Sequence, residues 1–270
     1  RKESEIAFGD GTMYIEHFVV NPRHIEFQIL ADSFGNVIHL GERDCSIQRN
    51  HQKMIEESPS AAVSPELREK MGHAAVTAAK AAGYVNAGTI EFLLEPDGKF
   101  WFMEMNTRIQ VEHPVTEWVT GIDLVKEQLK IASGMPLEIA QEDVRIQGHA
   151  IECRINAENP QKNFRPSPGT IQGAHFPGGN GIRVDTCVYN GCKIPPYYDS
   201  MLAKLIVHAG NRKEAIAKMQ SALGEVIIDG IDTNIDYQYE ILKDEDYQSG
   251  NFDTGFLASH IIAGVKINEN

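Results

Sequence analysis

The 270-residue sequence has little of what marks several classes of protein. Its four cysteines (Cys45, Cys153, Cys187 and Cys192) show neither zinc-ligand spacing nor the density of a disulfide scaffold. The formal net charge is −13, and no cluster of lysine or arginine is present, which argues against nucleic acid as the main partner. No apolar run approaches the roughly 20 residues that cross a bilayer. We therefore expect a protein of the reducing cytoplasm, without nucleic-acid or membrane partners.

Chemically active side chains are concentrated in one stretch, residues 102–117 (FMEMNTRIQVEHPVTE). Within ten residues it contains two acids, an amide, an arginine and a histidine (Glu104, Glu112, Asn106, Arg108 and His113). The apolar and aromatic residues 100–103 precede them, so a buried strand is predicted to lead into the stretch. Because buried charges need partners or a metal, the pattern indicates either a functional site or a structural ion-pair network.

A second acid, Glu91, lies in another strand-like run, and the turn signal of residues 95–99 (EPDGK) separates the two runs. Together they predict a β-hairpin with Asp97 and Gly98 at its tip. In one register of this hairpin, Glu91 faces Glu104 at roughly 5 Å. A hard cation between these carboxylates would remove their repulsion, and Asn106 would add a neutral oxygen, so a Mg²⁺ or Mn²⁺ site is predicted. In the alternative interpretation, one of the acids points to solvent.

Residues 41–57 (GERDCSIQRNHQKMIEE) form a locally basic stretch in an acidic protein. Six of its side chains are cationic, can become cationic or donate amide hydrogen bonds (Arg43, Gln48, Arg49, His51, Gln52 and Lys53). The low apolar content argues against a place in the core. The stretch is therefore predicted to be either an anion- or phosphate-binding segment or a solvated loop.

The remaining pattern predicts a mixture of strands and helices. Residues 24–31 alternate between apolar and polar, which is typical of a strand with one polar face. Further strands are predicted at 37–40, 149–156, 182–188 and 201–208. Helices are predicted at 64–82, 120–133, 211–224 and 236–242, and the first has Ser64 as N-cap with Pro65 after it. We expect a domain boundary between about 119 and 146.

Taken in order, these motifs resemble biotin carboxylase, an enzyme of the ATP-grasp superfamily. The matching segments are VNPRH (20–24), GERDCSIQRNHQK (41–53), AGTIEFLLE (87–95), EMNTRIQVEHPVTE (104–117), GHAIECRINAE (148–158), PSPG (166–169) and PPYYDSMLAKLI (195–206). The resemblance implies an α+β fold, in which an ATP-grasp antiparallel sheet with flanking helices precedes a C-terminal α+β domain. The expected divisions are the C-terminal part of the ATP-grasp domain (1–118), a helical linker (119–146), the biotin carboxylase C-terminal domain (147–262) and a polar tail (263–270).

The resemblance implies that bicarbonate carboxylates biotin at the expense of ATP, through carboxyphosphate. The biotin would be carried on a biotin carboxyl carrier protein, and a carboxyltransferase would use the product. This is the first half-reaction of a biotin-dependent carboxylase, such as the acetyl-CoA carboxylase of fatty acid biosynthesis, and the resemblance does not decide among these carboxylases. A homodimer is expected for the complete enzyme.

Residue by residue, the resemblance implies two sets of contacts. On the nucleotide side, Glu16, His17, Phe18 and Val19 would form the hinge segment against adenine, His24 would reach the ribose, Gln48 and His51 would contact the nucleotide, and Glu91, Glu104 and Asn106 would hold the divalent ions. On the acceptor side, Lys53, Arg108, Gln110 and the backbone of Val111 would hold bicarbonate, Glu112 would be the base, and Arg154 would stabilise the enolate-like oxygen of biotin. Arginine forks fit planar anions, whereas a carboxylate among cations must be well aimed to act as a base.

The sequence also departs from the family pattern. His17 stands where the family often has lysine, and Asn50 where it often has arginine. The glycine-rich lid and its two nucleotide-contacting lysines have no counterpart, so we expect a fragment that is inactive by itself. One alternative is an ATP-grasp ligase of the carbamoyl phosphate synthetase type, against which the motifs at 148–158 and 195–206 argue. The other is a non-catalytic structural fragment.

Overall fold

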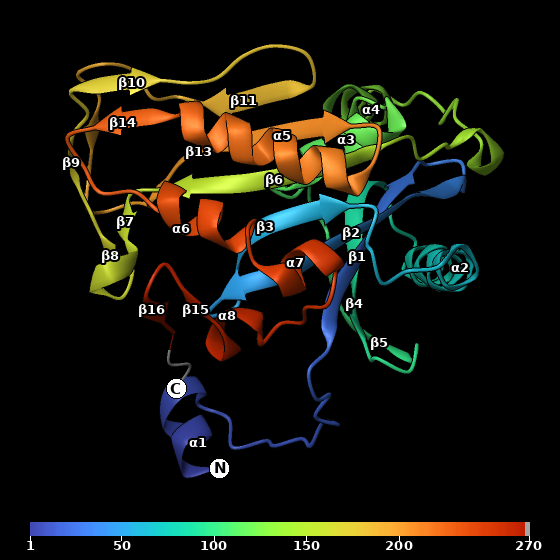
Figure 1. Ribbon diagram of the computed structural model, residues 1–270. Coiled ribbons are helices and arrows are strands. Elements are labelled where there is room, and N and C mark those ends of the chain that lie inside the picture. Colours follow the sequence, from blue (N-terminus) through green and yellow to red (C-terminus); the bar gives the residue numbers. More distant parts are fainter. Residues whose placement is uncertain (268–270) are drawn as a thin grey trace.

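An eight-stranded sheet forms the centre of the computed structural model, which describes residues 1–267. Its strand order is β11-β13-β6-β3-β2-β1-β4-β5, and each pair of neighbours is antiparallel (Figure 1). The strands are β1 (Arg23–Ala31), β2 (Val37–Arg49), β3 (Gln52–Ser58), β4 (Asn86–Leu94), β5 (Phe100–Asn106), β6 (His149–Asn156), β11 (Ile182–Thr186) and β13 (Met201–Ala209). One large antiparallel sheet with helices packed on it confirms the predicted α+β class.

This sheet contains strands from both sides of the proposed boundary at 119–146. β3 pairs with β6, so that Ile55 lies opposite Cys153 and Glu56 opposite Glu152. Apolar side chains of β2 and β3 share one core cluster with those of β6 and β13. The two segments of sequence therefore form a single hydrogen-bonded layer.

One face of the sheet is covered near β1 and β4 by α2 (Pro65–Ala81). Odd-numbered apolar residues of β1, such as Phe27, pack there against Met71, Ala75 and Ala79. The side chain of Ser64 accepts a hydrogen bond from the Leu67 N–H at 3.2 Å, which confirms the predicted N-cap. The alanines let the helix lie close to the sheet.

On the same side, α5 (Arg212–Glu225) covers β6 and β13, and Figure 1 shows it in front of these strands. Asn211 caps this helix by accepting from the Glu214 N–H at 3.0 Å. The cover continues through α6 (Ile235–Ile241), α7 (Glu245–Ser249) and α8 (Phe256–Ser259). The last two helices were not predicted, although Phe256 and Leu257 are buried in the same cluster.

The other face of the sheet carries α3 (His113–Thr120) and α4 (Leu124–Ala132). The prediction of one helix beginning at Thr120 was wrong at its start. Gly121, at a φ of 71°, ends α3, and the side chain of Asp123 caps α4 by accepting from the Lys126 N–H at 2.9 Å. The separate helix α3 was not predicted, and it is important for the site because it begins directly after Glu112.

The β4–β5 hairpin has the predicted register at its acids but not next to its tip. Glu91 lies opposite Glu104 and Thr89 opposite Asn106, as predicted. Nearer the turn, Leu94 pairs with Phe100, one residue away from the predicted register, and an irregularity between Glu91 and Phe92 restores the predicted pairing. Gly98, at a φ of 86°, lies in the predicted turn. The turn signal was therefore sufficient to predict the hairpin, whereas the irregularity that brings the two acids opposite each other was not predicted.

The expectation that residues 41–57 lie outside the core was wrong. They form most of β2 and β3, and residues 41–48 are buried throughout. Arg43 is fully buried. The polar face predicted for β1 is also covered, since Glu26 and Gln28 are fully buried. These charges are tolerated in the interior because the strands present them to one another.

Shorter elements complete the described residues. They are α1 (Lys2–Phe8), η1 (Gln141–Asp143), η2 (Pro160–Lys162), β7 (Glu158–Asn159), β8 (Arg165–Pro166), β9 (Gly169–Thr170), β10 (Gly173–His175), β12 (Lys193–Ile194), β14 (Ile227–Asp229), β15 (Ile261–Ile262) and β16 (Val265–Lys266). Residues 9–22 form no helix or strand. The predicted polar tail begins in the β15–β16 hairpin, and its last three residues, 268–270, lie outside the described part. Within residues 1–267, no helix has the length and apolar character needed to cross a bilayer.

Candidate active site

Arg43 is the centre of a buried polar network on the α3 side of the sheet. It lies opposite Glu26 in the β1–β2 pairing. Its guanidinium makes five hydrogen bonds, to Glu26 Oε1 (2.5 Å), Gln28 Oε1 (2.7 Å), Thr116 Oγ1 (3.0 Å), Thr89 Oγ1 (3.2 Å) and Gln110 Oε1 (3.0 Å). All five N–H donors of an arginine are thereby used. Arg43 thus ties β1, β2, β4 and α3 together, a structural role that differs from the anion-binding role considered for its stretch of sequence.

Lys53 is surrounded by three carboxylates. Its ammonium lies 2.5 Å from Glu26, 2.6 Å from Glu112 and 3.1 Å from Glu91. Burial would lower the pKa of Lys53, but these three carboxylates raise it well above its usual value. Burial would likewise raise the pKa of Glu26, but Arg43 and Lys53 lower it to about 2. Glu26, Arg43 and Lys53 are therefore all charged at neutral pH.

Glu91 is held as a carboxylate by donors on every side. Its Oε2 lies 2.8 Å from His24 Nε2. Its Oε1 accepts from Lys53, Asn106 Nδ2 (3.0 Å) and Gln110 Nε2 (2.7 Å). Burial acts to raise the pKa of Glu91, but the hydrogen bond with His24 and the charge of Lys53 hold it far below its usual range. The predicted ribose contact His24 is thus engaged with a predicted metal acid.

The side chains predicted to hold a metal ion, Glu91, Glu104 and Asn106, lie close together in the hairpin. The amide nitrogen of Asn106 donates to both Glu91 Oε1 and Glu104 Oε1, each at 3.0 Å. The amide therefore bridges the two carboxylates, and Glu104 is exposed on the outer side. Two carboxylates and an amide that can present its oxygen are a donor set that suits Mg²⁺ or Mn²⁺. The residues present fit the predicted ion.

Glu112 and Arg154 form the end of the network nearest β6. Glu112 Oε1 accepts from Lys53, and Glu112 Oε2 lies 3.1 Å from Arg154 Nη2. Arg154 also donates from Nε to Glu56 Oε1 at 2.5 Å. The carbonyl oxygen of Val111 accepts from Lys204 Nζ at 2.8 Å. The predicted base and the predicted biotin arginine are therefore in direct contact.

Other predicted residues lie apart from this network. Arg108 is exposed and donates to the neighbouring carbonyl oxygen of Ile109 at 3.1 Å. Gln48 is buried at the end of β2, and His51 is exposed in the β2–β3 turn. In the hinge segment, Glu16, His17 and Phe18 are exposed and Val19 is buried. The ring of His17 lies 5.5 Å from that of Trp101 on β5.

Sequence reasoning missed Glu26, Glu56 and Lys204 as members of the network, and it named Arg43 only as a candidate anion-binding side chain. A regular hairpin around the turn at 32–36 would place Glu26 opposite Glu42. Only the irregularity between Phe27 and Ile29 brings Glu26 opposite Arg43, and no local pattern predicts it. For Glu56 and Lys204, the partners come from segments about a hundred residues away, and no local pattern contains them.

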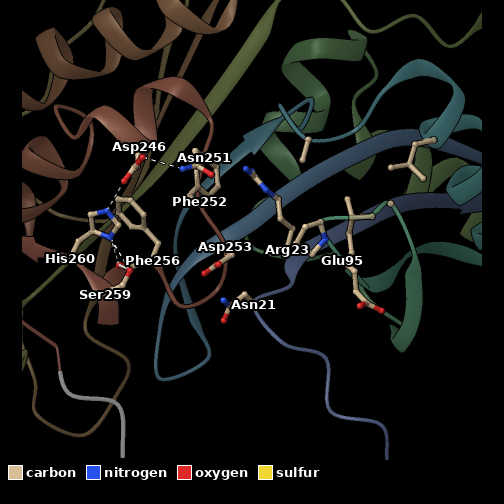
Figure 2. A pocket seen from close by; sticks show the side chains of 15 residues that line it. Asn21, Arg23, Glu95, Asp246, Asn251, Phe252, Asp253, Phe256, Ser259 and His260 are labelled. Carbon is tan, nitrogen blue, oxygen red and sulfur yellow. Dashed lines mark hydrogen bonds and ion pairs between the residues drawn. The ribbon is translucent and has the colours of Figure 1, made fainter.

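A cavity of about 420 Å³ lies elsewhere, between the end of β4 and helices α7 and α8 (Figure 2). Arg23, Glu95, Asp253 and His260 are among its lining residues, and none of the predicted site residues is. His260 Nε2 lies 3.1 Å from Asp246, and both are labelled in Figure 2. The cavity is therefore separate from the charged network.

Comparisons with known proteins show which families the sequence of this chain matches. Residues 1–140 match the family model "Carbamoyl-phosphate synthase L chain, ATP binding domain", and residues 152–259 match "Biotin carboxylase C-terminal domain". The chain is 57% identical to Biotin carboxylase 1 of Bacillus subtilis over 265 residues, which cover 98% of this chain and 59% of that protein.

Two solved structures agree with these matches. The biotin carboxylase domain of Hydrogenobacter thermophilus 2-oxoglutarate carboxylase superimposes with a TM-score of 0.91 at 53% identity, over 95% of this chain and 56% of that one. That protein was solved as a dimer in complex with MgADP, ADP and bicarbonate. The biotin carboxylase subunit of pyruvate carboxylase superimposes with a TM-score of 0.88 at 54% identity, over 95% and 57%. The chain thus spans somewhat more than half the length of the relatives it matches.

Proposed function

This chain belongs to the biotin carboxylase family of ATP-grasp proteins, and on that premise we propose that it carries the site for ATP-dependent carboxylation of biotin by bicarbonate. The observation that carries the proposal is the contact chain from Glu91 through Lys53 and Glu112 to Arg154. In the proposal, this chain of contacts runs from an acid that would hold the metal to the position proposed for bicarbonate, and then to the arginine proposed for biotin. A structural ion-pair network alone does not require this order.

On the nucleotide side, the proposal uses the β4–β5 hairpin. Glu91, Glu104 and Asn106 would hold Mg²⁺ or Mn²⁺, which supplies charge stabilisation to the phosphates of ATP when bound. The hinge residues Glu16, His17, Phe18 and Val19 would contact adenine, and His24, Gln48 and His51 would contact the rest of the nucleotide. The relative solved with MgADP supports the proposal of a nucleotide and a divalent ion as ligands.

On the bicarbonate side, the existing ion pairs suggest how the anion is held. Lys53 now binds three carboxylates, and bicarbonate would share its ammonium with them. Gln110 and the backbone of Val111 lie beside this position, and exposed Arg108 would turn toward the anion. Glu112 would then take the proton of bicarbonate at a carboxylate oxygen, which must first separate from Lys53 or Arg154. Because Glu112 lies between Lys53 and Arg154, its carboxylate is held in position to take the proton, although a carboxylate is only a weak base.

On the acceptor side, Arg154 would stabilise negative charge on the biotin oxygen while N1 of biotin loses its proton. The biotin would arrive on a biotin carboxyl carrier protein, and a carboxyltransferase would complete the overall reaction. We also propose a homodimer, since one relative was solved as a dimer, and a cytoplasmic location. The named relatives belong to different carboxylases, so the proposal covers the half-reaction alone. The match to the C-terminal domain model disfavours a carbamoyl phosphate synthetase.

The test is Glu112→Gln in the complete enzyme, with ATP binding and carboxybiotin formation measured separately. The amide keeps the shape of the side chain but cannot accept the proton. We expect ATP binding to persist and carboxylation to fall by roughly 10²- to 10⁴-fold. The matched control is Glu69→Gln on the exposed surface of α2, which should leave both unchanged. Full bicarbonate-dependent turnover in Glu112→Gln would exclude Glu112 as the base.

A further inference from the structure

Two carboxylates are buried against each other behind Arg154. Glu56 on β3 and Glu152 on β6 are direct partners in the antiparallel pairing, and both are fully buried. Within residues 1–267, neither oxygen of Glu152 has a hydrogen-bond partner, and neither does Oε2 of Glu56. The remaining oxygen, Glu56 Oε1, accepts from Arg154 Nε at 2.5 Å. Three of the four carboxylate oxygens therefore lack a donor among the described residues.

Such a pair cannot carry two negative charges in a dry interior. Side chains opposite each other in an antiparallel pair have Cβ atoms about 4.5–5.5 Å apart, and two carboxylates at this distance raise each other's pKa. An unpaired buried carboxylate is also costly, whereas a protonated one carries its own donor. Burial raises the pKa of Glu152 well above its usual value, and the charge of Glu56 adds to the rise.

The surrounding groups distinguish the two acids. The charged and titratable groups that act on the pair from each packed element are Cys45 on β2, Lys53 on β3, Glu112 beside α3, Cys153 and Arg154 on β6, and Lys204 on β13. Arg154 bonds to Glu56 and not to Glu152. Lys204 is held by Val111 and by Asp185 at 3.3 Å. Glu56 is therefore the acid that bears the charge, and Glu152 the acid that keeps a proton.

We propose that Glu56 is a positioning residue for Arg154, and that Glu152 stays protonated so that the pair presents a single negative charge behind it. This proposal rests on the proposed function, in which Arg154 meets biotin. Glu56 holds the guanidinium by its Nε side. The Nη2 side, which now contacts Glu112, is then directed into the site and is available to the acceptor. Without this anchor, Arg154 would pair with Glu112 alone.

The orientation of Arg154 should depend on pH. Burial raises the pKa of Glu56 to about 7, Glu112 adds to the rise and Arg154 opposes it. The anchoring carboxylate is therefore present above about pH 7 and is lost as the pH falls through that value. Turnover that needs Arg154 should decline on the acid side near pH 7. Bicarbonate-dependent ATP cleavage without biotin does not use the acceptor arginine, so its profile should lack this particular step.

The experiment measures two rates in the complete enzyme from pH 5.5 to 9 (roughly one and a half to two units on each side of the expected midpoint). These are carboxybiotin formation from free biotin and bicarbonate-dependent ATP cleavage without biotin, and their ratio isolates the acceptor step. We expect Glu56→Gln to lower this ratio by roughly ten- to a hundredfold, the value of one charge-assisted hydrogen bond, and to remove the acid-side step. Glu56→Asp, which keeps the charge, should restore part of the ratio.

Glu152 is tested by infrared spectroscopy, because a protonated carboxyl absorbs apart from a carboxylate. The wild-type enzyme should show a buried acid band that persists at pH 8 and disappears in Glu152→Gln. An unchanged ratio in a folded Glu56→Gln enzyme, judged by an unaltered melting temperature, would overturn the positioning role. Loss of both rates together would overturn it as well, since a structural role explains that result. An absent acid band would refute the proton on Glu152. If the wild-type enzyme cleaved no ATP with bicarbonate, the proposed function itself would fail.

Discussion

Replacing Arg43 by methionine removes the centre of the buried network. The side chain donates five hydrogen bonds, and its loss leaves the fully buried Glu26 with Lys53 as its salt-bridge partner among the described residues. Five charge-assisted bonds at roughly 1.5–3 kcal/mol each would equal the whole stability of an ordinary domain, about 5–15 kcal/mol. The bonds share one guanidinium and are not additive. The value for removing one member of a buried ion pair is therefore more realistic, and we expect a loss of about 3–5 kcal/mol.

The loss should depend on pH in a defined direction. The folded pKa of Glu26 is about 2, below the ordinary value of 4.5. Its charged interactions therefore stabilise the fold fully above about pH 4.5 and are lost as the pH falls toward 2. Without Arg43, Glu26 is more easily protonated. A fall in pH therefore lowers the free energy of unfolding less in the variant than in the wild type. The difference in stability should be largest at pH 7 and should narrow between pH 4.5 and 3.

Urea unfolding followed by tryptophan fluorescence measures this difference. Trp118 lies on α3, two residues from Thr116, and reports on the same region. Arg43→Lys keeps the positive charge but not the planar guanidinium with its five donors, so its loss of stability should be intermediate. Arg165→Met, at an exposed arginine of β8, is the matched control and should change stability by less than about 0.5 kcal/mol. A loss below about 1 kcal/mol at pH 7 in Arg43→Met, or a loss that grows in acid, would refute the reasoning.

Two further predictions concern the site in the complete enzyme. Arg154→Ala should reduce carboxybiotin formation more than bicarbonate-dependent ATP cleavage, because the arginine is proposed to contact biotin. An equal fall in both rates would assign Arg154 to carboxyphosphate or to the fold. Glu104→Gln should raise the Mg²⁺ concentration needed for half-maximal ATP cleavage by roughly tenfold or more, the effect of one charge-assisted contact. Since Glu104 is exposed, its loss should leave the melting temperature unchanged, and an unaltered Mg²⁺ requirement would exclude it as a ligand.

The β4–β5 hairpin shows what the sequence could predict. Its turn and two apolar runs are adjacent in the chain, so the hairpin itself followed from local signals, whereas the irregularity between Glu91 and Phe92 that brings Glu91 opposite Glu104 did not. The helix after Ser64 followed from its cap in the same way. By contrast, α7 and α8 are four to five residues long, too short for an apolar period to be read.

The error over residues 41–57 has a physical cause. A polar, basic stretch was taken to be outside the core because isolated charges are costly there. That rule applies to unpaired charges, and these are paired. Glu26 faces Arg43 across β1 and β2, and Lys53 on β3 completes the set. The composition of a single stretch could not reveal this, because each charge is compensated by a residue on another strand.

The same argument explains why the acceptor end of the site was the hardest part to predict. Arg154 joins the network only because β3 pairs with β6, a contact between residues 98 positions apart. The pairing of β3 with β6 brings Glu56 on β3 next to Arg154, and it places Glu152 on β6 opposite Glu56. Motif resemblance suggested Arg154 but not the acids that hold it, since their function depends on being opposite one another. A buried acid that faces a second acid across such a pairing is costly to keep for stability alone, which makes Glu56 and Glu152 informative positions for testing how Arg154 is oriented.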